Sequence, residues 1–252
     1  MEKKRIIEVL DTGVLAGKIM LESGAEMYRV EDTIDRIVRK GGLNRPELFT
    51  TQTGIFVSAD ETYYTKMAEI KSDSINLEKV SQVNDLSRKY VAGDITLDQL
   101  HSGLRKINWR VKDFPFRIKL IGAFLTSCTL MILFTGKYDW FDFIQAGIVG
   151  TIGYIVDYYI QNVIRVKFIS EFIASAVIAL LAVFLKHIGL LYSVNYLIIG
   201  AVMPLVPGVA LTNALRDLLS GHLISGLSRM TDGTLTAIAI GAGIASVLKF
   251  II

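Results

Sequence analysis

The sequence predicts a membrane protein: a soluble N-terminal α+β domain, residues 1–112, followed by an all-α bundle of about five transmembrane helices, residues 113–252. The first observation is uneven charge: residues 1–119 hold 38 of the 51 Lys, Arg, Asp and Glu residues, and residues 120–252 hold 13. The second is that apolar runs of roughly 20 residues, the length that crosses a bilayer, recur only in the second part. The mean hydropathy of +0.45 is therefore the average of a charged segment and an apolar segment.

Amphipathic periodicity predicts two helices at the start of the N-terminal domain. Apolar residues at helical spacing run from Ile6 to Leu21, and the pattern ends near Ser23. A second such face runs from Met27 to Val38 and ends at two glycines. Since Ser23 and Glu26 form an S-x-x-E pattern, we expect a capping box at the start of the second helix.

Two β-rich runs follow, residues 48–58 and 63–71, and the polar residues between them predict a hairpin turn. Two more helices are expected after the hairpin. The first begins at a cap supplied by Asp73, Ser74 or Asn76, and the second begins at a capping box of Thr96 and Gln99. The predicted order of this small domain is α-α-β-β-α-α.

Five apolar segments predict the membrane-spanning helices, residues 118–136, 143–164, 168–185, 188–206 and 234–252. Between the last two, residues 207–233 are too polar to span a bilayer and too apolar for a simple loop. Basic residues are concentrated just before the first span, which places the N-terminal domain in the cytoplasm and the C-terminus outside. The first residues lack the apolar core and cleavage site of a signal peptide.

Several function classes are disfavoured by what the sequence lacks. A scattered net charge of +3 does not suit a nucleic-acid-binding protein. The single cysteine, Cys128, and three widely separated histidines offer no disulfide framework and no metal site. Phosphate-loop, nucleophile-elbow and zinc-protease motifs are missing, so we expect neither an enzyme nor a cofactor, and no catalytic residues. A transporter of this kind would be driven by an ion gradient and not by ATP.

Ionisable residues inside apolar segments are informative because charge at the bilayer centre is costly. Asp157 is either a residue of a transport pathway or an interfacial partner of Arg165. Glu171 has the same two interpretations, with Lys167 as its alternative partner.

The irregular segment 207–233 is the most polar part of the membrane region. Arg216 and Asp217 follow the break at Pro207 and Gly208, and broken helices expose backbone groups that bind polar substrates. The alternative is a re-entrant turn closed by a structural ion pair. Further polarity in the same segment comes from Asn213, Ser220, His222, Ser225 and Arg229.

In the N-terminal domain, two short segments are candidates for ligand contact. One helix carries Glu26, Arg29, Glu31 and Asp32, which are candidates for ligand binding. The alternatives are capping for Glu26 and a solvated helix face for Glu31 and Asp35. Thr53 and Gly54 lie within the first β-rich run and mark either a bulge or a site of close approach. Glycines at 147, 150, 153, 241 and 243 are more typical of close helix packing than of substrate contact.

Four segments together resemble the threonine/serine exporter family: LESGAEMYRVEDTIDRI (21–37), TTQTGIFVS (50–58), INLEKVSQVNDL (75–86) and PGVALTNALRDLLSGHLISGLSRMTDG (207–233). Full-length members of that family combine a soluble domain with about ten spans. The chain therefore resembles the larger subunit of the split, two-component form, whose partner is a small, membrane-embedded subunit of the same family. His222 departs from the family pattern, which often carries an acidic residue there.

The resemblance implies a secondary exporter in a bacterial inner membrane that moves threonine and serine, or a dicarboxylate such as succinate, outward and is coupled to protons. The alternative is a regulatory or scaffolding subunit whose soluble domain binds a ligand while the small partner transports. Membrane lipid and a small-molecule substrate are the expected contacts, and a homo-oligomer is possible. The residues expected to bind substrate are Asn213, Arg216, Ser225, Arg229, Pro207 and Gly208, and those expected to couple to protons are Asp217, Asp157 and Glu171.

Overall fold

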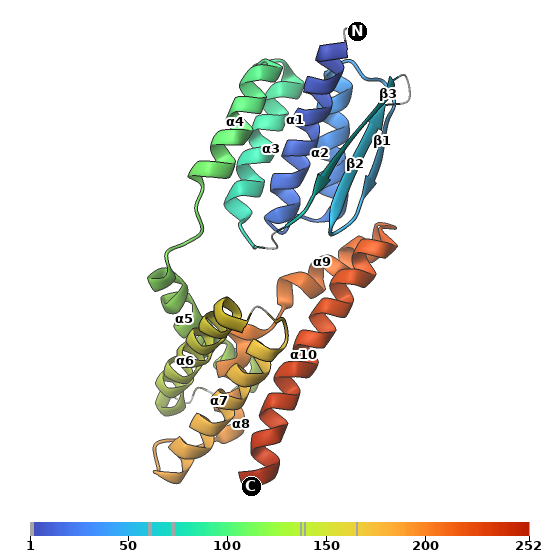
Figure 1. Ribbon diagram of the computed structural model, residues 1–252. Helices are drawn as coiled ribbons and strands as arrows, with labels where there is room; N and C mark the ends of the chain where they lie inside the picture. The colour runs from blue at the N-terminus through green and yellow to red at the C-terminus, as the bar shows by residue number, and fades with distance from the viewer. Residues whose placement is uncertain are drawn as a thin grey trace. The chain divides into compact units, whose positions relative to one another are not determined.

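The computed structural model describes residues 3–59, 62–71, 74–136, 138, 140–164 and 166–251 (Figure 1). The chain divides into two compact units. The first unit comprises Met1–Asp113 and Val209–Met230, and the second comprises Phe114–Gly208 and Thr231–Ile252. A short stretch from the second half of the sequence therefore folds with the N-terminal domain.

Four helices and a small sheet make up the N-terminal part of the first unit (Figure 1). The helices are α1 (Lys3–Glu22), α2 (Met27–Lys40), α3 (Leu77–Ala92) and α4 (Leu97–Arg110). The antiparallel sheet has the order β1-β2-β3 and packs against α1 and α2. Its strands are β1 (Pro46–Thr50), β2 (Gly54–Ala59) and β3 (Thr62–Glu69). The core lies between these layers and is built from Leu10, Ile19, Met20, Met27, Ile34, Ile37, Ile55, Leu100 and Leu104.

The predicted hairpin between the runs 48–58 and 63–71 is confirmed, because β2 and β3 pair antiparallel, but the first run forms two strands and not one. The run 48–58 is divided by a tight turn between β1 and β2. The Thr51 backbone N–H donates to the Gly54 carbonyl at 2.8 Å, and the Gly54 N–H donates to the Thr51 hydroxyl at 3.1 Å. A threonine hydroxyl closes this turn, and threonine is also a strand-former, so the sequence pattern did not reveal the break.

Helix caps in the first unit follow the sequence in two cases and depart from it in one. The capping box of Thr96 and Gln99 is confirmed at α4, and Asn76 caps α3 by accepting from the Lys79 N–H at 3.1 Å. Of the other two candidates there, Ser74 donates its hydroxyl to the Glu22 carbonyl at 3.3 Å, and Asp73 lies outside the described residues. The box expected from Ser23 and Glu26 is wrong, because Glu26 itself precedes the first residue of α2 and its side chain makes no cap hydrogen bond.

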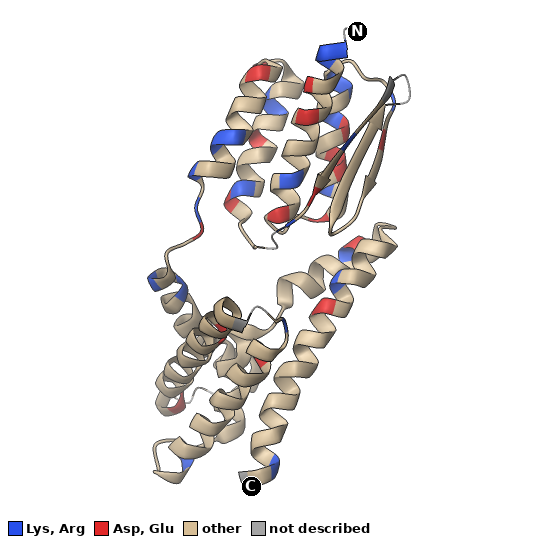
Figure 2. Ribbon diagram, in the orientation of Figure 1, with Lys and Arg blue, Asp and Glu red and all other residues tan. Residues whose placement is uncertain are grey.

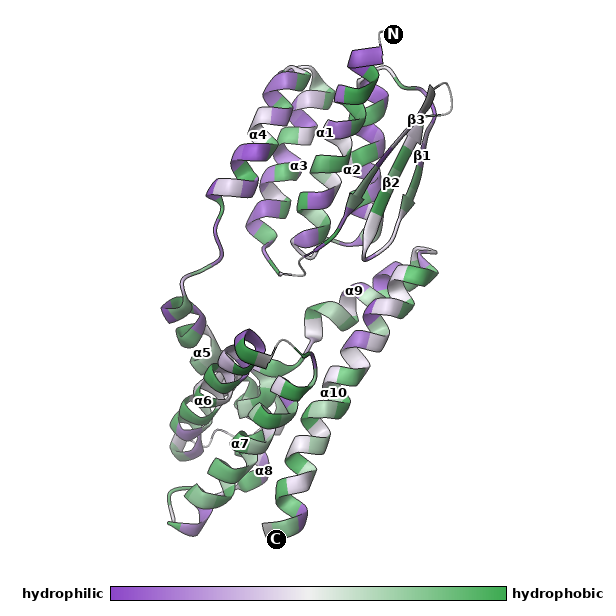
Figure 3. Cartoon of the chain, viewed as in Figure 1, coloured by the Kyte–Doolittle hydropathy of each residue, from purple (hydrophilic) through white to green (hydrophobic). Residues whose placement is uncertain are grey.

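The second unit is built from long apolar helices (Figure 3). These are α5 (Phe116–Thr135), α6 (Trp140–Ile164), α7 (Ile169–His187) and the C-terminal part of α10 (Leu223–Ile251). At most 33% of the apolar window of any of them is buried within the structure, as expected of helices whose remaining surface faces lipid. Charged residues are sparse along α5 to α8 and frequent along α1 to α4 (Figure 2).

The described part of the chain has four helices long and apolar enough to cross a membrane, or five if a bent pair counts as one span. The bent pair joins α8 (Val194–Val202) and the short helix η1 (Met203–Leu205) to α9 (Gly208–Leu219) at 63°. The fourth expected span, 188–206, thus contains a shorter helix. The last helix begins at Leu223 and not at residue 234, because the polar residues before Thr234 are also helical.

Candidate functional site

The polar segment after Pro207 forms a helical hairpin of α9 and the first turns of α10. Gly221 has a φ of +88° in the turn between them, and the His222 N–H donates to the Asp217 carbonyl at 2.9 Å. A Cβ at Gly226 on α10 would lie 2.6 Å from Leu218 Cγ and 2.9 Å from its backbone nitrogen on α9. Glycine at this position therefore lets the two helices pack closely.

Three side chains of this hairpin bind the backbone of residues 24–27, which we call the α2 turn because it leads into α2. Asn213 Nδ2 donates to the Gly24 carbonyl at 3.0 Å, and Arg229 Nη2 donates to the Ala25 carbonyl at 3.0 Å. Asp217 Oδ1 accepts from the Met27 N–H at 2.9 Å. A carboxylate at a helix N-terminus satisfies a free N–H and complements the helix dipole, so Asp217 supplies the cap of α2.

The hairpin side chains of this network are buried. Asp217 is 0% exposed, Arg229 is 5% exposed and Asn213 is 7% exposed. Arg229 Nε lies 3.3 Å from Asp217 Oδ2, an ion-pair distance, but neither of these two atoms has a partner in hydrogen-bond geometry in the described part of the chain. The charges of Asp217 and Arg229 compensate each other, and backbone groups add hydrogen bonds to both. Removing either residue would therefore leave the other as an uncompensated buried charge.

Glu26 links the network to two arginines. Its carboxylate pairs with Arg216 of α9 and, at 3.0 Å, with Arg29 Nε of α2. Because Asp217 caps α2, the Glu26 side chain is available for these pairs. A hydrogen bond to the Tyr28 hydroxyl and the charge of Glu26 raise the pKa of Arg29 above its ordinary value.

The other candidates of the N-terminal domain have different surroundings. Glu31 accepts a hydrogen bond from Thr50 and lies 3.7 Å from His222 Nε2 of the hairpin. Asp32 is exposed, and both of its carboxylate oxygens accept from Arg36 Nε. Thr53 lies in the β1–β2 turn, where its carbonyl accepts from the Ile70 N–H at 3.0 Å, and Gly54 is the first residue of β2.

The two carboxylates predicted in the membrane region lie together in the second unit. Gln161 Nε2 donates to Asp157 at 3.1 Å, and Ser170 and Glu171 also interact with the Asp157 carboxylate. The Ser170 hydroxyl donates to Glu171 Oε2 at 2.7 Å, and both residues are buried. The structure thus brings together two acidic residues from α6 and α7 that are separate in the sequence.

The alternative pairing of Glu171 with Lys167 is wrong, and that of Asp157 with Arg165 stays a prediction. Lys167 pairs with Asp232 at 2.8 Å and not with Glu171. Arg165, the partner considered for Asp157, lies outside the described residues.

The remaining candidates lie near the bend and along α10. Pro207 is half-buried and Gly208 is exposed at the break before α9, and Ser225 is buried in the hairpin. Glycines 147, 150, 153 and 243 lie where a Cβ would collide with a neighbouring helix, so their interpretation as packing residues is confirmed. A Cβ at Gly241 meets nothing within 4 Å in the described part of the chain, so no close packing is seen at this glycine.

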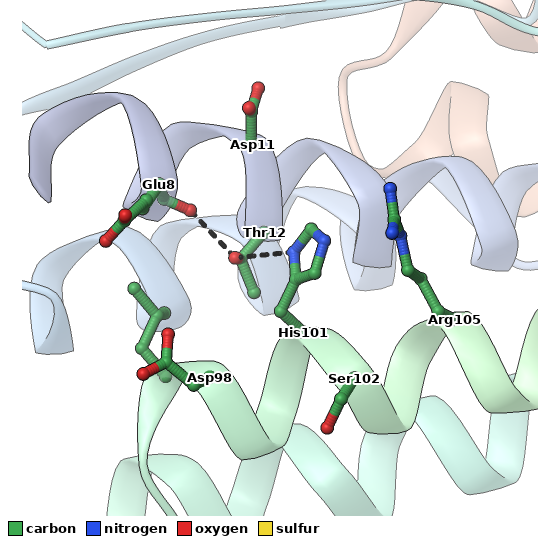
Figure 4. Close-up of a pocket in the computed structure, with 8 residues that line it drawn as sticks. Glu8, Asp11, Thr12, Asp98, His101, Ser102 and Arg105 are labelled. Carbon is green, nitrogen blue, oxygen red and sulfur yellow. Dashed lines mark hydrogen bonds between the residues drawn. The ribbon is translucent and has the colours of Figure 1, made fainter. Parts of the chain in front are cut away.

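The sequence interpretation missed two cavities of the first unit. One, of about 430 Å³, is lined by residues of α1 and α4, which are Glu8, Asp11, Thr12, Leu97, Asp98, His101, Ser102 and Arg105. In Figure 4 the His101 ring lies beside Thr12, with its Nδ1 atom 3.1 Å from the Thr12 hydroxyl. The spacing of Asp98, His101, Ser102 and Arg105 on one helix face was the signal that could have indicated this cavity. The other, of about 300 Å³, is lined by residues of α2 and α3.

Comparison with known proteins gives two matches. Residues 11–251 match the family described as "Putative threonine/serine exporter". A protein of Mycobacterium tuberculosis named "Probable threonine/serine exporter" is 22% identical over 245 residues, which cover 94% of this chain and 45% of that protein. The chain thus spans about half the length of this curated relative. No solved structure gives a significant match.

The family match covers nearly the whole chain, including the N-terminal domain, the polar hairpin and the apolar helices. With four to five apolar helices of spanning length in the described residues, the chain is a multi-pass membrane protein. It belongs to the threonine/serine exporter family.

Proposed function

We propose that this chain is a subunit of a secondary exporter that moves small polar metabolites, threonine and serine or a dicarboxylate, out of a bacterial cell. The observation that carries the proposal is the family match over residues 11–251. It is supported by Asp157 and Glu171, which interact with each other on apolar helices. Ionisable groups in such segments typically mark substrate or proton pathways.

Asp157 and Glu171 are the proposed proton-coupling residues. Export of preloaded serine, threonine and succinate is measured from cells that express the chain with its partner, at several external pH values. Asp157→Asn and Glu171→Gln are expected to reduce export at least tenfold and to flatten its pH dependence. Asp85→Asn, which alters an exposed carboxylate of α3, is the matched control and should export normally. Full export with unchanged pH dependence in both α6 and α7 variants would exclude this role.

The roles proposed for the hairpin residues follow from their exposure. Arg216 has a side chain 49% exposed, so it can bind a substrate carboxylate when Glu26 releases it. Asp217, Asn213 and Arg229 are engaged by the α2 turn, and a direct role in transport requires that this contact opens. Arg216→Gln is expected to reduce export while the melting temperature stays near that of the unmodified chain, and unchanged export contradicts the substrate role.

A second membrane module is proposed as the partner. More than half of the curated relative lies outside the region that matches this chain. We propose that a small, membrane-embedded subunit of the same family supplies the equivalent part. Co-purification of the two subunits and transport by the pair in liposomes, but by neither alone, is the expected result.

The contact between the hairpin and the α2 turn favours one alternative function, that of a regulatory subunit. In that case the N-terminal domain binds a ligand and controls a partner that transports alone. Expressing each subunit separately distinguishes the two functions, because export by the partner alone contradicts the leading proposal.

The orientation proposed for the chain places the N-terminal domain in the cytoplasm and the C-terminus outside. Basic residues before α5 support the first placement. The α9–α10 hairpin and the N-terminal domain belong to one unit, which supports a position of both on the same side of the membrane. The intervening chain must then cross an even number of times, with α8 as the fourth crossing, and α10 crosses outward.

A further inference from the structure

The cavity between α2 and α3 has an excess of positive charge. Arg29, Arg36 and Arg88 line it together with a single carboxylate, Asp32. Asp32 is occupied by Arg36, with oxygens 2.8 and 2.9 Å from its Nε. Arg88 is exposed and has no ion pair in the part of the chain that the structure describes. At least one guanidinium group in this cavity is therefore uncompensated.

The hydroxyl of Thr33, in the same cavity, also lacks a partner among the described residues. Thr33 is 5% exposed and lines the cavity, and among the described residues nothing accepts from or donates to its side chain. Threonine within a helix commonly donates to a carbonyl one turn earlier, and Thr33 does not. The Ser87 hydroxyl, by contrast, donates to the Asn84 carbonyl at 2.9 Å and keeps only its acceptor capacity. Thr33 can therefore donate to an acceptor placed in the cavity.

We infer that this cavity binds a small oxyanion, a carboxylate or a phosphate group. Guanidinium groups bind such oxygens through paired, charge-assisted hydrogen bonds, and the Thr33 hydroxyl adds a neutral donor. A volume of about 300 Å³ suits a small anion. The inference goes beyond export, because it gives the N-terminal domain a ligand of its own.

Glu26 connects this site to the hairpin. Arg29 lines the cavity, and its Nε lies 3.0 Å from the Glu26 carboxylate, which also holds Arg216 of α9. A bound anion and Glu26 therefore compete for Arg29. By linkage, removing the Glu26 charge strengthens anion binding, and anion binding alters the contact between Glu26 and α9.

The inference is tested by calorimetric titration of the purified full chain, in uncharged detergent, with inorganic phosphate and with malonate. Arg88→Gln is expected to weaken binding about tenfold, the effect of one charge-assisted hydrogen bond. Thr33→Val should weaken it less, and Glu26→Gln should strengthen it several-fold. Arg45→Gln removes an exposed arginine outside the cavity and should leave binding unchanged.

The inference is overturned if the unmodified chain binds neither probe, if Arg88→Gln binds as the unmodified chain does, or if Arg45→Gln loses as much as Arg88→Gln. Titration in nanodiscs of phosphatidylcholine, with and without phosphatidylglycerol, separates the two sources of an oxyanion. Equal phosphate affinity in the two kinds of nanodisc shows that the site binds a free anion. A lower phosphate affinity in the presence of phosphatidylglycerol shows that the lipid headgroup competes for the site. Either result supports the oxyanion site. The readout is binding and not transport, so it can fail or succeed independently of the proposed export function.

Discussion

At the scale of single residues, Asn213, Asp217 and Arg229 hold the α9–α10 hairpin to the α2 turn. Asn213, Arg216, Asp217 and Arg229 stood out because polar groups are rare in an apolar context. Their contacts lie in the α2 turn, and the bond from Met27 to Asp217 joins residues 190 positions apart. No local pattern encodes such a contact. The capping pattern at Ser23 failed for the same reason, since a distant carboxylate supplies the cap instead.

Asp217→Asn is expected to destabilise the protein by about 3 kcal/mol, because it leaves the buried Arg229 guanidinium without its opposite charge. The amide oxygen can still accept from the Met27 N–H, which keeps the loss at the lower end of the range for broken buried pairs. Thermal unfolding of the purified chain, followed by helical circular dichroism, measures the loss. Adding Arg229→Gln to this variant removes the unpaired charge and should recover part of the lost stability.

The matched control is Asp85→Asn, which alters an exposed pair with Lys89 at 3.7 Å. Exposed pairs of this kind contribute less than about 1 kcal/mol, so its unfolding should be near that of the unmodified chain. Equal stability of the Asp217 and Asp85 variants would show that the buried pair does not hold the hairpin to the α2 turn.

At the scale of elements, periodicity and composition predicted most helices but not all strand breaks. The helices α1 and α2 and the capping box of α4 follow from local spacing and local hydrogen bonds, which a sequence contains. The division of the run 48–58 into β1 and β2 depends on a turn closed by a threonine, which also favours strands. The early start of α10 depends on polar turns that pack within the first unit.

Gly243→Ala and Gly241→Ala test the packing of α10 with a matched pair on one helix. A Cβ at Gly243 would collide with the Ser175 side chain and the Phe172 backbone of α7, whereas a Cβ at Gly241 meets nothing within 4 Å. Because the Phe172 carbonyl belongs to the backbone of α7 and cannot move freely, Gly243→Ala should destabilise the protein by about 1–3 kcal/mol. Gly241→Ala should be neutral or stabilising by up to about 1 kcal/mol, the helix preference of alanine over glycine. Thermal unfolding of both variants in detergent measures the difference, and equal melting temperatures would contradict close packing at Gly243.

At the scale of the whole molecule, the charge contrast along the sequence separated a charged N-terminal domain from an apolar membrane region. It could not show that residues 209–230 leave the membrane region and join the first unit. That assignment depends on contacts between distant segments. The shorter α8, with η1, covers Val194–Leu205, and a helix of that length is only about 18 Å long, less than the bilayer core.

Reporter fusions test the crossing count that follows from this arrangement. If α8 crosses, fusions after Thr135, His187 and Ile251 lie outside, and fusions after Ile164 and Leu219 lie in the cytoplasm. Alkaline phosphatase is active only outside and green fluorescent protein fluoresces only in the cytoplasm, so the two reporters should give opposite signals at each site. The decisive site is Leu219, at the end of α9. A phosphatase signal there would place the hairpin on the side opposite the N-terminal domain, which is incompatible with the bonds from Asn213, Asp217 and Arg229 to the α2 turn.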